Sequence, residues 1–225
     1  MSTQLPIQEK EPSSTTLVAA LSIAGFLSGI IIIAVYLATF DTIAENKARE
    51  LREAVFRVLP GVSQMQKLRF DGEELVVAPA EQKDDEDTIY GGYDDKGNFV
   101  GYAIASAGPG FQDTIRVLYG YQPAERKVVG MWILESRETP GLGDKIYKDA
   151  VFVANFDDLA IDPQIVTMKK GTKSAPNEID AITGATISSK AVVRIINEGH
   201  AVWDKRLPRP GAEPRLAIVQ PESEK

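Results

Sequence analysis

The most prominent pattern in the chain is a long apolar run near the N-terminus. Residues 17–40 read LVAALSIAGFLSGIIIIAVYLATF, and no charged residue occurs between Glu11 and Asp41. As a helix rising about 1.5 Å per residue, this run would extend roughly 36 Å, which is enough for a hydrocarbon core of about 30 Å. It is too long for the apolar part of a signal peptide. The pattern predicts one transmembrane helix over residues 17–40, preceded by a segment over residues 1–16.

A second helical pattern follows over residues 41–61. Its apolar residues recur on one face at helical spacing, and they are Ile43, Ala48, Leu51, Val55 and Leu59. A proline and a glycine at positions 60 and 61 predict its end. We expect a linker helix whose apolar face packs on the following domain or on another membrane protein.

The pattern then changes to short runs rich in β-branched and aromatic residues, separated by turns. The runs predict strands over residues 74–78, 88–93, 99–105, 114–121 and 128–134. The acidic residues 84–87 read as a solvated loop. Helical period returns over residues 188–203, and residues 205–225 are rich in proline and charge, which predicts a loose tail. Strands followed by a late helix indicate an α+β domain over residues 62–204, with an antiparallel sheet and packed helices.

Composition narrows the possible functions. Asp and Glu number 32 against 25 Lys and Arg, so the net charge is -7 and a nucleic-acid-binding surface is not expected. The chain has no cysteine, which excludes iron–sulfur ligation, thiolate zinc sites and disulfides within it. His200 is the only histidine. One histidine cannot form a histidine metal site, so no metal is expected. We predict that His200 is a surface or helix-end residue. Any redox chemistry must come from an organic cofactor or a partner.

Two motifs could carry chemistry, and the first is ETPGLGD at residues 138–144, directly after a predicted strand. Its glycines and proline would allow the backbone to approach a flat ligand closely and to offer free N–H groups. An ordinary turn explains the same residues. Neither the G-x-G-x-x-G pattern nor a P-loop is present.

The second motif is DAITGATISS at residues 180–189, immediately before the late helix. Thr183 or Ser188 could cap the helix, which explains hydroxyl residues at this place. Capping is the simpler interpretation, but a phosphate is also favourable at a helix N-terminus, and Gly184 and Ala185 would leave room for one on Thr186. Threonine is a weak nucleophile, so an enzyme would have to form such a bond. Local chemistry leaves both interpretations open.

Residues 180–186, DAITGAT, resemble the flavinylation motif D-x-x-[ST]-G-A-T of FMN-binding domains. In those domains a flavin transferase links FMN through its phosphate to the last threonine. The upstream ETPGLG resembles the second hallmark of the same domains. With the N-terminal span, the chain resembles the G subunit of Rnf-type ion-translocating electron transport complexes, and its relative, the C subunit of sodium-translocating NADH:quinone reductase. Its length and the RETPGLGDKI segment favour the Rnf-type subunit.

The resemblance implies a role for each matching residue. Thr186 would be the covalent acceptor of FMN, and Asp180 would orient the acceptor or assist the transferase. The cradle around the acceptor would consist of Thr183, Gly184 and Ala185. The wall against the isoalloxazine ring would consist of Glu138, Thr139, Gly141 and Leu142.

The implied function is electron relay beside other membrane subunits of an Rnf-type complex, which couples electron flow between ferredoxin and NAD to sodium or proton transport. The FMN domain would lie on the periplasmic side of a bacterial or archaeal cytoplasmic membrane, with residues 1–16 in the cytoplasm. Basic residues after the span, such as Arg49 and Arg52, favour the opposite orientation by themselves, but long translocated domains weaken that rule. A stand-alone flavin shuttle, a flavin-domain sensory protein and a structural subunit without flavin are the alternatives.

Overall fold

The computed structural model describes residues 13–79 and 82–217. These form two compact units, Met1–Arg49 and Glu50–Lys225, which we describe separately. Helix α1, Ser14–Val58, supplies the described part of the first unit and continues into the second. The predicted transmembrane and linker helices are therefore one helix with no break at residue 41. The physical reason is that residues 41–58 contain neither proline nor glycine.

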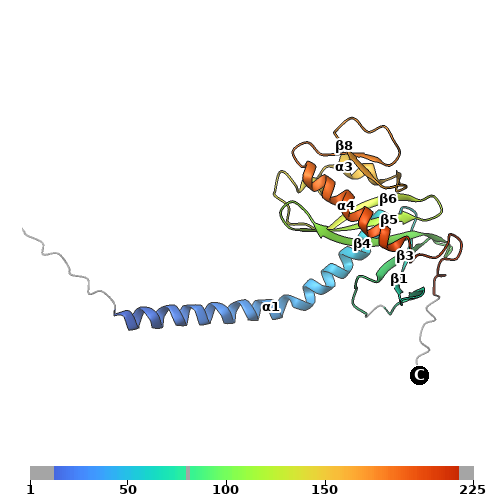
Figure 1. Ribbon diagram of the computed structural model, residues 1–225. Coiled ribbons are helices and arrows are strands. Elements are labelled where there is room, and N and C mark those ends of the chain that lie inside the picture. The colour runs from blue at the N-terminus through green and yellow to red at the C-terminus, as the bar shows by residue number, and fades with distance from the viewer. Residues whose placement is uncertain (1–12, 80–81, 218–225) are drawn as a thin grey trace, which may run out of the picture. The chain divides into compact units, whose positions relative to one another are not determined.

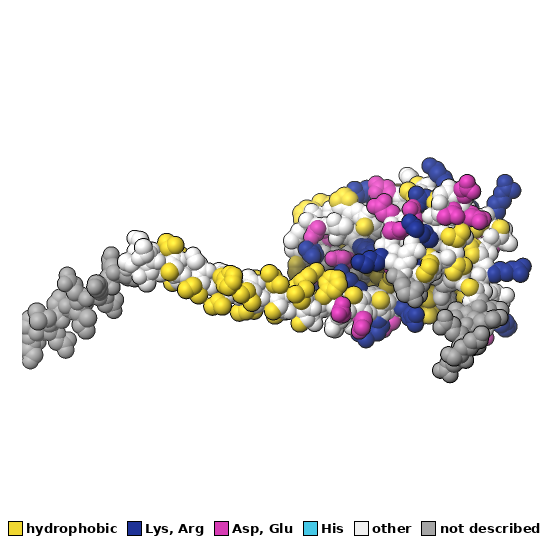
Figure 2. Space-filling view, turned by 90° about the horizontal axis from the view of Figure 1, so that it is seen from below, with side chains coloured by type: hydrophobic (Ala, Val, Ile, Leu, Met, Phe, Trp, Pro, Cys, Tyr) yellow, Lys and Arg dark blue, Asp and Glu magenta, His cyan; other side chains and the backbone are white. Residues whose placement is uncertain are grey.

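In the first unit, residues 17–40 of α1 are apolar on every side of the helix. Leu21 and Ile32 are 74% and 68% exposed, and the apolar side chains along α1 are visible in Figure 2. Within the described residues, α1 is the one helix long and apolar enough to cross a membrane. A helix that is apolar on all sides is stable in a nonaqueous environment, which agrees with the predicted membrane span.

The second unit is built on one antiparallel sheet with the strand order β2-β1-β3-β4-β5-β6-β7 (Figure 1). The strands are β1 (Gln64–Phe70), β2 (Leu75–Val77), β3 (Thr88–Tyr93), β4 (Phe99–Pro109), β5 (Thr114–Gln122), β6 (Lys127–Glu135) and β7 (Leu159–Ala160). Each of the five predicted strands is present, within a few residues at its ends. Strands β1 and β7 were not predicted, because β1 is largely polar in sequence and β7 has only two residues.

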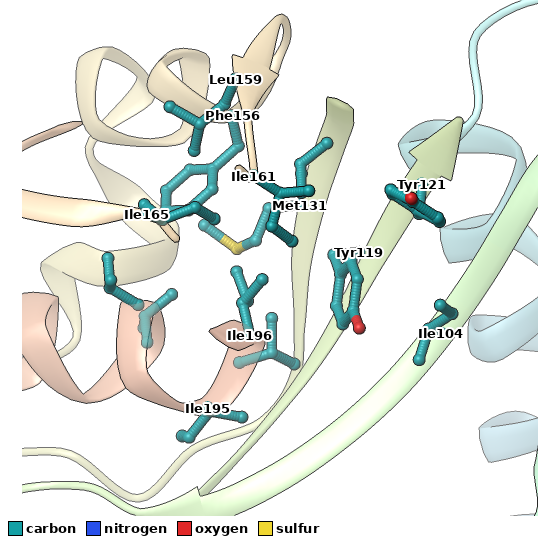
Figure 3. Packing of buried hydrophobic residues seen from close by; sticks show 14 of the residues in the cluster. Ile104, Tyr119, Tyr121, Met131, Phe156, Leu159, Ile161, Ile165, Ile195 and Ile196 are labelled. Carbon is teal, nitrogen blue, oxygen red and sulfur yellow. The ribbon is translucent and has the colours of Figure 1, made fainter. Parts of the chain in front are cut away.

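Both faces of the sheet are covered, because successive side chains of a strand point to opposite sides. One face packs on helix α4, Thr186–Trp203, which crosses β4 and β5. In Figure 3 Ile196 of α4 lies toward Met131 of the sheet. The Ile195 side chain packs beside Gly108 of β4. The opposite face packs on the end of α1 in a smaller cluster of Ala54, Val55, Val58, Leu59, Tyr90, Ala103, Leu118 and Val129.

The remaining elements connect β6 to α4. They are the short helices α2 (Lys145–Lys148) and α3 (Ala150–Val153), a 3₁₀ turn η1 (Ala154–Phe156), and a parallel pair of strands β8 (Val166–Met168) and β9 (Glu178–Asp180). The helix predicted over residues 188–203 begins two residues earlier, at Thr186. An α+β fold with an antiparallel sheet and packed helices is confirmed.

Three expectations need correction. His200 lies in the last turn of α4 but is buried, with its ring against Tyr121 at 4.7 Å between centroids. The predicted loose tail is held as far as the structure describes it, because Tyr93 donates a hydrogen bond to the Pro214 carbonyl at 2.6 Å. Residues 218–225 lie outside the described part. The acidic loop is not simply solvated, since Asp84 pairs with Lys67 at 2.6 Å.

Candidate functional site

Three loops meet at the N-terminus of α4. They are the turn between β4 and β5, the loop after β6 that contains ETPGLGD, and the segment 181–185 that leads into the helix. Together they enclose a cavity of about 300 Å³, which we call the first cavity. Its lining residues are Phe111, Thr139, Leu142, Gly143, Gly184, Ala185, Thr186, Ile187 and Ser188. Both sequence motifs therefore contribute to one site.

A buried carboxylate joins these loops beneath the first cavity. Glu138 is 5% exposed, and its Oε1 accepts hydrogen bonds from the backbone N–H groups of Phe111 and Gln112, both at 2.9 Å. Its Oε2 accepts a hydrogen bond from the Ser188 hydroxyl on α4. Burial alone would raise the pKa of Glu138, but the bonds from Ser188, Gln112 and Phe111 outweigh burial and lower the pKa below its usual value. The carboxylate is thus ionised and fixes the relative positions of the three loops.

Gly143 is required by this close packing. A Cβ atom at this position would lie 2.5 Å from Oε2 of Glu138 and 2.9 Å from Oγ of Ser188. Any side chain would separate the ETPGLGD loop from α4 or displace the carboxylate. The last glycine of ETPGLG therefore has a packing role under the cavity.

The first turn of α4 has no side-chain cap. The residue before it, Ala185, has no side chain that could accept a bond, and no described side chain caps the turn. The Ser188 hydroxyl donates to Glu138. The Ser189 hydroxyl accepts from the Ile182 N–H at 3.1 Å, and Ile182 precedes α4, so this bond does not cap the first turn. Neither Thr183 nor Ser188 therefore acts as the predicted cap. The N–H groups of the first turn and the positive end of the helix dipole remain available to an anion.

The segment before α4 turns sharply at Gly184, whose φ is +83°. This left-handed conformation suits glycine and is unfavourable for residues with a Cβ. Ala185 is buried, whereas Thr186 is exposed and lines the first cavity. The turn therefore presents the Thr186 hydroxyl at the surface. Its one hydrogen bond within residues 13–79 and 82–217 is a long one of 3.4 Å, donated to the Ile182 carbonyl.

The rim of the first cavity is apolar. Phe111, Leu142 and Ile187 are 63%, 51% and 58% exposed, and each comes from a different one of the elements around the cavity. Large apolar side chains with this exposure commonly mark a ligand or partner site. An apolar rim beside an uncapped helix N-terminus suits a ligand with a flat apolar ring and an anionic group, as FMN has.

Some of the predicted site residues line the first cavity and others do not. Thr139, Leu142, Gly184, Ala185 and Thr186 all line the first cavity. Glu138 lies beneath it instead of forming its wall, and Gly141 and Thr183 are not among its lining residues.

Asp180 contacts the loop after β8, and its role toward the acceptor or the transferase stays a prediction. Its Oδ1 accepts hydrogen bonds from the backbone N–H groups of Gly171, Thr172 and Lys173 at 2.9, 3.3 and 3.3 Å. The carboxylate therefore braces the loop after β8, and no bond to Thr186 is present among the described residues.

Sequence reasoning did not predict Phe111, Gly143, Ile187 or Ser188 as site residues. Phe111 and Ile187 are apolar residues that could equally belong to a core, so only their exposure identifies them. The sequence indicates only a capping role for Ser188, because its bond to Glu138 joins residues fifty positions apart. A contact of that separation is set by the fold.

Residues 110–200 match the model of the FMN-binding domain family. This match includes the first cavity and most of α4, so the fold and site define a protein with an FMN-binding domain. Three relatives extend the similarity. The chain is 33% identical over 181 residues to the G subunit of the proton-translocating ferredoxin:NAD(+) oxidoreductase complex of Clostridium ljungdahlii, covering 79% of this chain and 85% of that one. It is 32% identical to the G subunit of the ion-translocating oxidoreductase complex of Methanosarcina acetivorans over 65% of this chain and 71% of that one.

The third relative is the G subunit of the Na(+)-translocating ferredoxin:NAD(+) oxidoreductase complex of Acetobacterium woodii. Identity is 38% over 48% of this chain, and the match spans about half of that relative, 51% of its length. The chain belongs to the family of G subunits of ion-translocating oxidoreductase complexes. This confirms the resemblance to the Rnf-type subunit.

Solved structures show the same fold. The C subunit of the Na(+)-translocating NADH-quinone reductase from Parabacteroides distasonis superposes with a TM-score of 0.58 at 21% identity, covering 75% of this chain and 96% of that one. NqrC of Shewanella oneidensis superposes with a TM-score of 0.55 at 17% identity, covering 68% and 91%. At these identities the comparison establishes the architecture only.

Proposed function

We propose that this protein carries FMN joined through its phosphate to the hydroxyl oxygen of Thr186 and relays electrons within an Rnf-type ion-translocating complex. The observation that carries the proposal is the position of Thr186, which is exposed at the uncapped start of α4 and beside an apolar-rimmed cavity. The uncapped N–H groups and the helix dipole would stabilise the phosphate charge. Leu142, Phe111 and Ile187 would contact the isoalloxazine ring and exclude water from it.

The attachment step needs a flavin transferase and an activated flavin donor of the dinucleotide class. The Thr186 oxygen forms a bond to the flavin phosphorus, and the pyrophosphate bond of the donor breaks. The nucleoside monophosphate leaves, and the hydroxyl proton passes to a base of the transferase. No electrons are transferred in this step, so neither an oxidant nor a reductant is required.

Bound FMN supplies the ability to accept and donate electrons one or two at a time. The protein contributes position, since covalent attachment prevents dissociation and α1 keeps the domain at the membrane near its partners. Because the chain has no cysteine, those partners would hold any iron–sulfur clusters. The relatives from A. woodii and C. ljungdahlii are named for sodium and proton translocation respectively, so both ions are candidates. We infer a periplasmic position for the FMN domain.

The test is in-gel flavin fluorescence. The full chain is produced with a flavin transferase, denatured, and viewed under ultraviolet light beside Thr186→Ala, Thr186→Ser and Thr114→Ala. Thr114 is an exposed threonine at the start of β5, outside the first cavity, and serves as the matched control. We expect a fluorescent band for the wild type and Thr114→Ala, a weaker band for Thr186→Ser, and none for Thr186→Ala.

A wild-type chain without fluorescence, made beside a transferase that labels another substrate, would contradict covalent attachment and favour a structural subunit without flavin. Affinity purification from native membranes then separates the remaining classes. Recovery of other complex subunits with the tagged chain supports a role in the complex. Recovery of a flavin-labelled chain by itself from gently solubilised membranes would favour a stand-alone shuttle or a sensory protein.

A further inference from the structure

A second cavity adjoins the first at Thr186. It has a volume of about 280 Å³ and shares Gly184 and Thr186 with the first cavity. Its lining residues are Thr167, Met168, Lys169, Lys170, Ala181, Thr183, Gly184, Thr186 and Lys190. Whereas the first cavity has an apolar rim, the second contains three lysines and no acidic residue.

The parallel pairing of β8 and β9 brings two of these lysines to the site. Met168 at the end of β8 is in register with Asp180 at the end of β9, and the Ala181 N–H bonds to the Met168 carbonyl at 2.9 Å. Parallel strands end at the same edge of a sheet. Lys169 and Lys170 therefore follow β8 beside the segment that leads from β9 to Thr186.

Asp180 holds this lysine loop in place. Its carboxylate accepts three backbone hydrogen bonds from residues 171–173, which immediately follow Lys170. The loop is also closed by the Thr172 hydroxyl, which donates to the Lys169 carbonyl at 2.7 Å. The acidic residue of the flavinylation motif thus acts on the second cavity as a positioning residue.

The third lysine comes from α4. Lys190 follows Thr186 by four residues, so the two side chains lie on one face of the helix, one turn apart. Among the described residues, no carboxylate lies within 4.0 Å of the ammonium groups of Lys169, Lys170 or Lys190. Three lysines therefore line the same cavity as Thr186, and none has an ion-pair partner among the described residues. They gather there in a chain whose net charge is -7.

We propose that Lys169, Lys170 and Lys190 form a cationic subsite for a flavin phosphate group at Thr186. This rests on the proposed function, because the ligand is the group that would be esterified to Thr186. The shared chemistry is a phosphate oxyanion, which lysine binds as a point charge. Two sources present it: the phosphodiester of attached FMN, and the pyrophosphate of the incoming flavin donor before transfer.

The experiment compares charge-removing variants of the full chain with matched controls. The variants are Lys169→Gln/Lys170→Gln, Lys190→Gln, their combination, and Lys190→Arg, which keeps the charge. The controls are Lys96→Gln, in the turn between β3 and β4, and Lys205→Gln, after α4; both lysines are exposed. Each chain is incubated with purified transferase and flavin dinucleotide, and the fluorescent band is followed over time.

A second readout is the steady-state fluorescence anisotropy of the flavin in chains labelled to completion, measured at low and high sodium chloride. If the subsite binds the donor, the combined variant should label about tenfold more slowly, the effect of losing one charge-assisted hydrogen bond. If it binds the attached phosphodiester, the flavin anisotropy should fall in the combined variant, and salt should lower it in the wild type by screening. Lys190→Arg should behave as the wild type in either case.

The inference is overturned if the combined variant matches the two controls in both labelling rate and anisotropy. That result leaves the proposed function intact, because the wild type is still labelled. An unlabelled wild type contradicts the proposed function and the subsite together. Thermal melting of every variant shows whether a loss of labelling comes from unfolding. If the combined variant melts early, the single variant Lys190→Gln, at an exposed helix position, tests the subsite instead.

Discussion

At the scale of single residues, Glu138 shows how one buried charge can organise a site. Its two oxygens accept three hydrogen bonds from two different elements, and this full set of donors stabilises the ionised form in spite of burial. The resemblance implied a wall residue for the flavin. In the structure, Glu138 joins the turn between β4 and β5 to α4 through its hydrogen bonds.

Replacing Glu138 by glutamine should lower the free energy of unfolding by about 1–3 kcal/mol. The neutral amide keeps one accepting oxygen for the backbone N–H groups, but those hydrogen bonds lose their charge assistance. The Ser188 hydroxyl must turn to accept from the amide N–H₂ group, whose second N–H is buried without an acceptor. The measurement is chemical denaturation of the detergent-solubilised chain, followed by tryptophan fluorescence. Glu135→Gln, at an exposed position near the end of β6, is the control. Equal stability of the two variants would contradict the organising role of Glu138.

His200 should make the free energy of unfolding depend on pH near neutrality. It is the only histidine, so no other side chain has an ordinary pKa in that range. Burial lowers the pKa of His200 below its ordinary 6.5, although nearby Asp204 opposes this. The unfolded chain therefore binds the proton more readily than the folded chain, and the free energy of unfolding should fall as the pH is lowered below about 6.5. His200→Phe should flatten this dependence between about pH 5 and pH 7. Denaturation curves at several pH values test it, and an unchanged slope in His200→Phe would assign the dependence to other groups.

At the scale of elements, the site depends on how α4 begins. The helix starts two residues after the left-handed Gly184, and no side chain in the described part of the protein caps its first turn. Its serines Ser188 and Ser189 bond to Glu138 and to the preceding segment. The hydroxyl residues that resembled a capping sequence are thus used for tertiary contacts. The start of α4 remains free for an anion.

Substitutions of Gly184 test this element. Asparagine tolerates the left-handed conformation, whereas valine does not. Gly184→Asn should therefore retain much of the melting temperature and flavin labelling, and Gly184→Val should lose about 1–2 kcal/mol of stability together with most of the labelling. Thermal melting and in-gel fluorescence measure the two effects. Equal behaviour of both variants would show that the conformation at this turn is not critical.

At the scale of the whole molecule, α1 has two functions along one continuous helix. Its first part is exposed and apolar, as a membrane anchor requires. Its last residues, including Val55 and Val58, are fully buried against the sheet of the second unit. The end of the anchor helix is therefore part of the core of the FMN-binding domain.

Two truncations should separate these functions. A chain that begins at Glu50 keeps every α1 residue of the smaller cluster and should be soluble, folded and labelled by the transferase. A chain that begins at Val62 uncovers Leu118 and Val129 on the sheet and should melt at a lower temperature or aggregate. Size-exclusion chromatography and thermal melting compare the two. Similar stability would show that the end of α1 is dispensable for the domain.

Much of the architecture followed from local patterns. The apolar run, the late helix and five strands are visible in sequence because their periodicity is continuous over many residues. Strand β1 was missed because its side chains are mostly polar, and β8 and β9 because each has only three residues. Packing of the linker helix on the domain was one of two predicted alternatives, and the cluster at the end of α1 confirms it. That α4 and α1 cover opposite faces of the sheet was not visible, since this arrangement joins segments far apart in the chain.

By itself, the sequence determined that the chain has a membrane-length apolar helix, an α+β domain, no cysteine chemistry, and two motifs that identify an FMN-binding domain with Thr186 as the candidate acceptor. These properties depend on composition, periodicity and short motifs, which are local. Only the tertiary structure decided that Glu138 supports the cavity from beneath, that Asp180 braces a lysine loop, and that the apolar and basic cavities meet at Thr186. Such relations depend on contacts between distant segments, and strand pairing and packing bring those segments together.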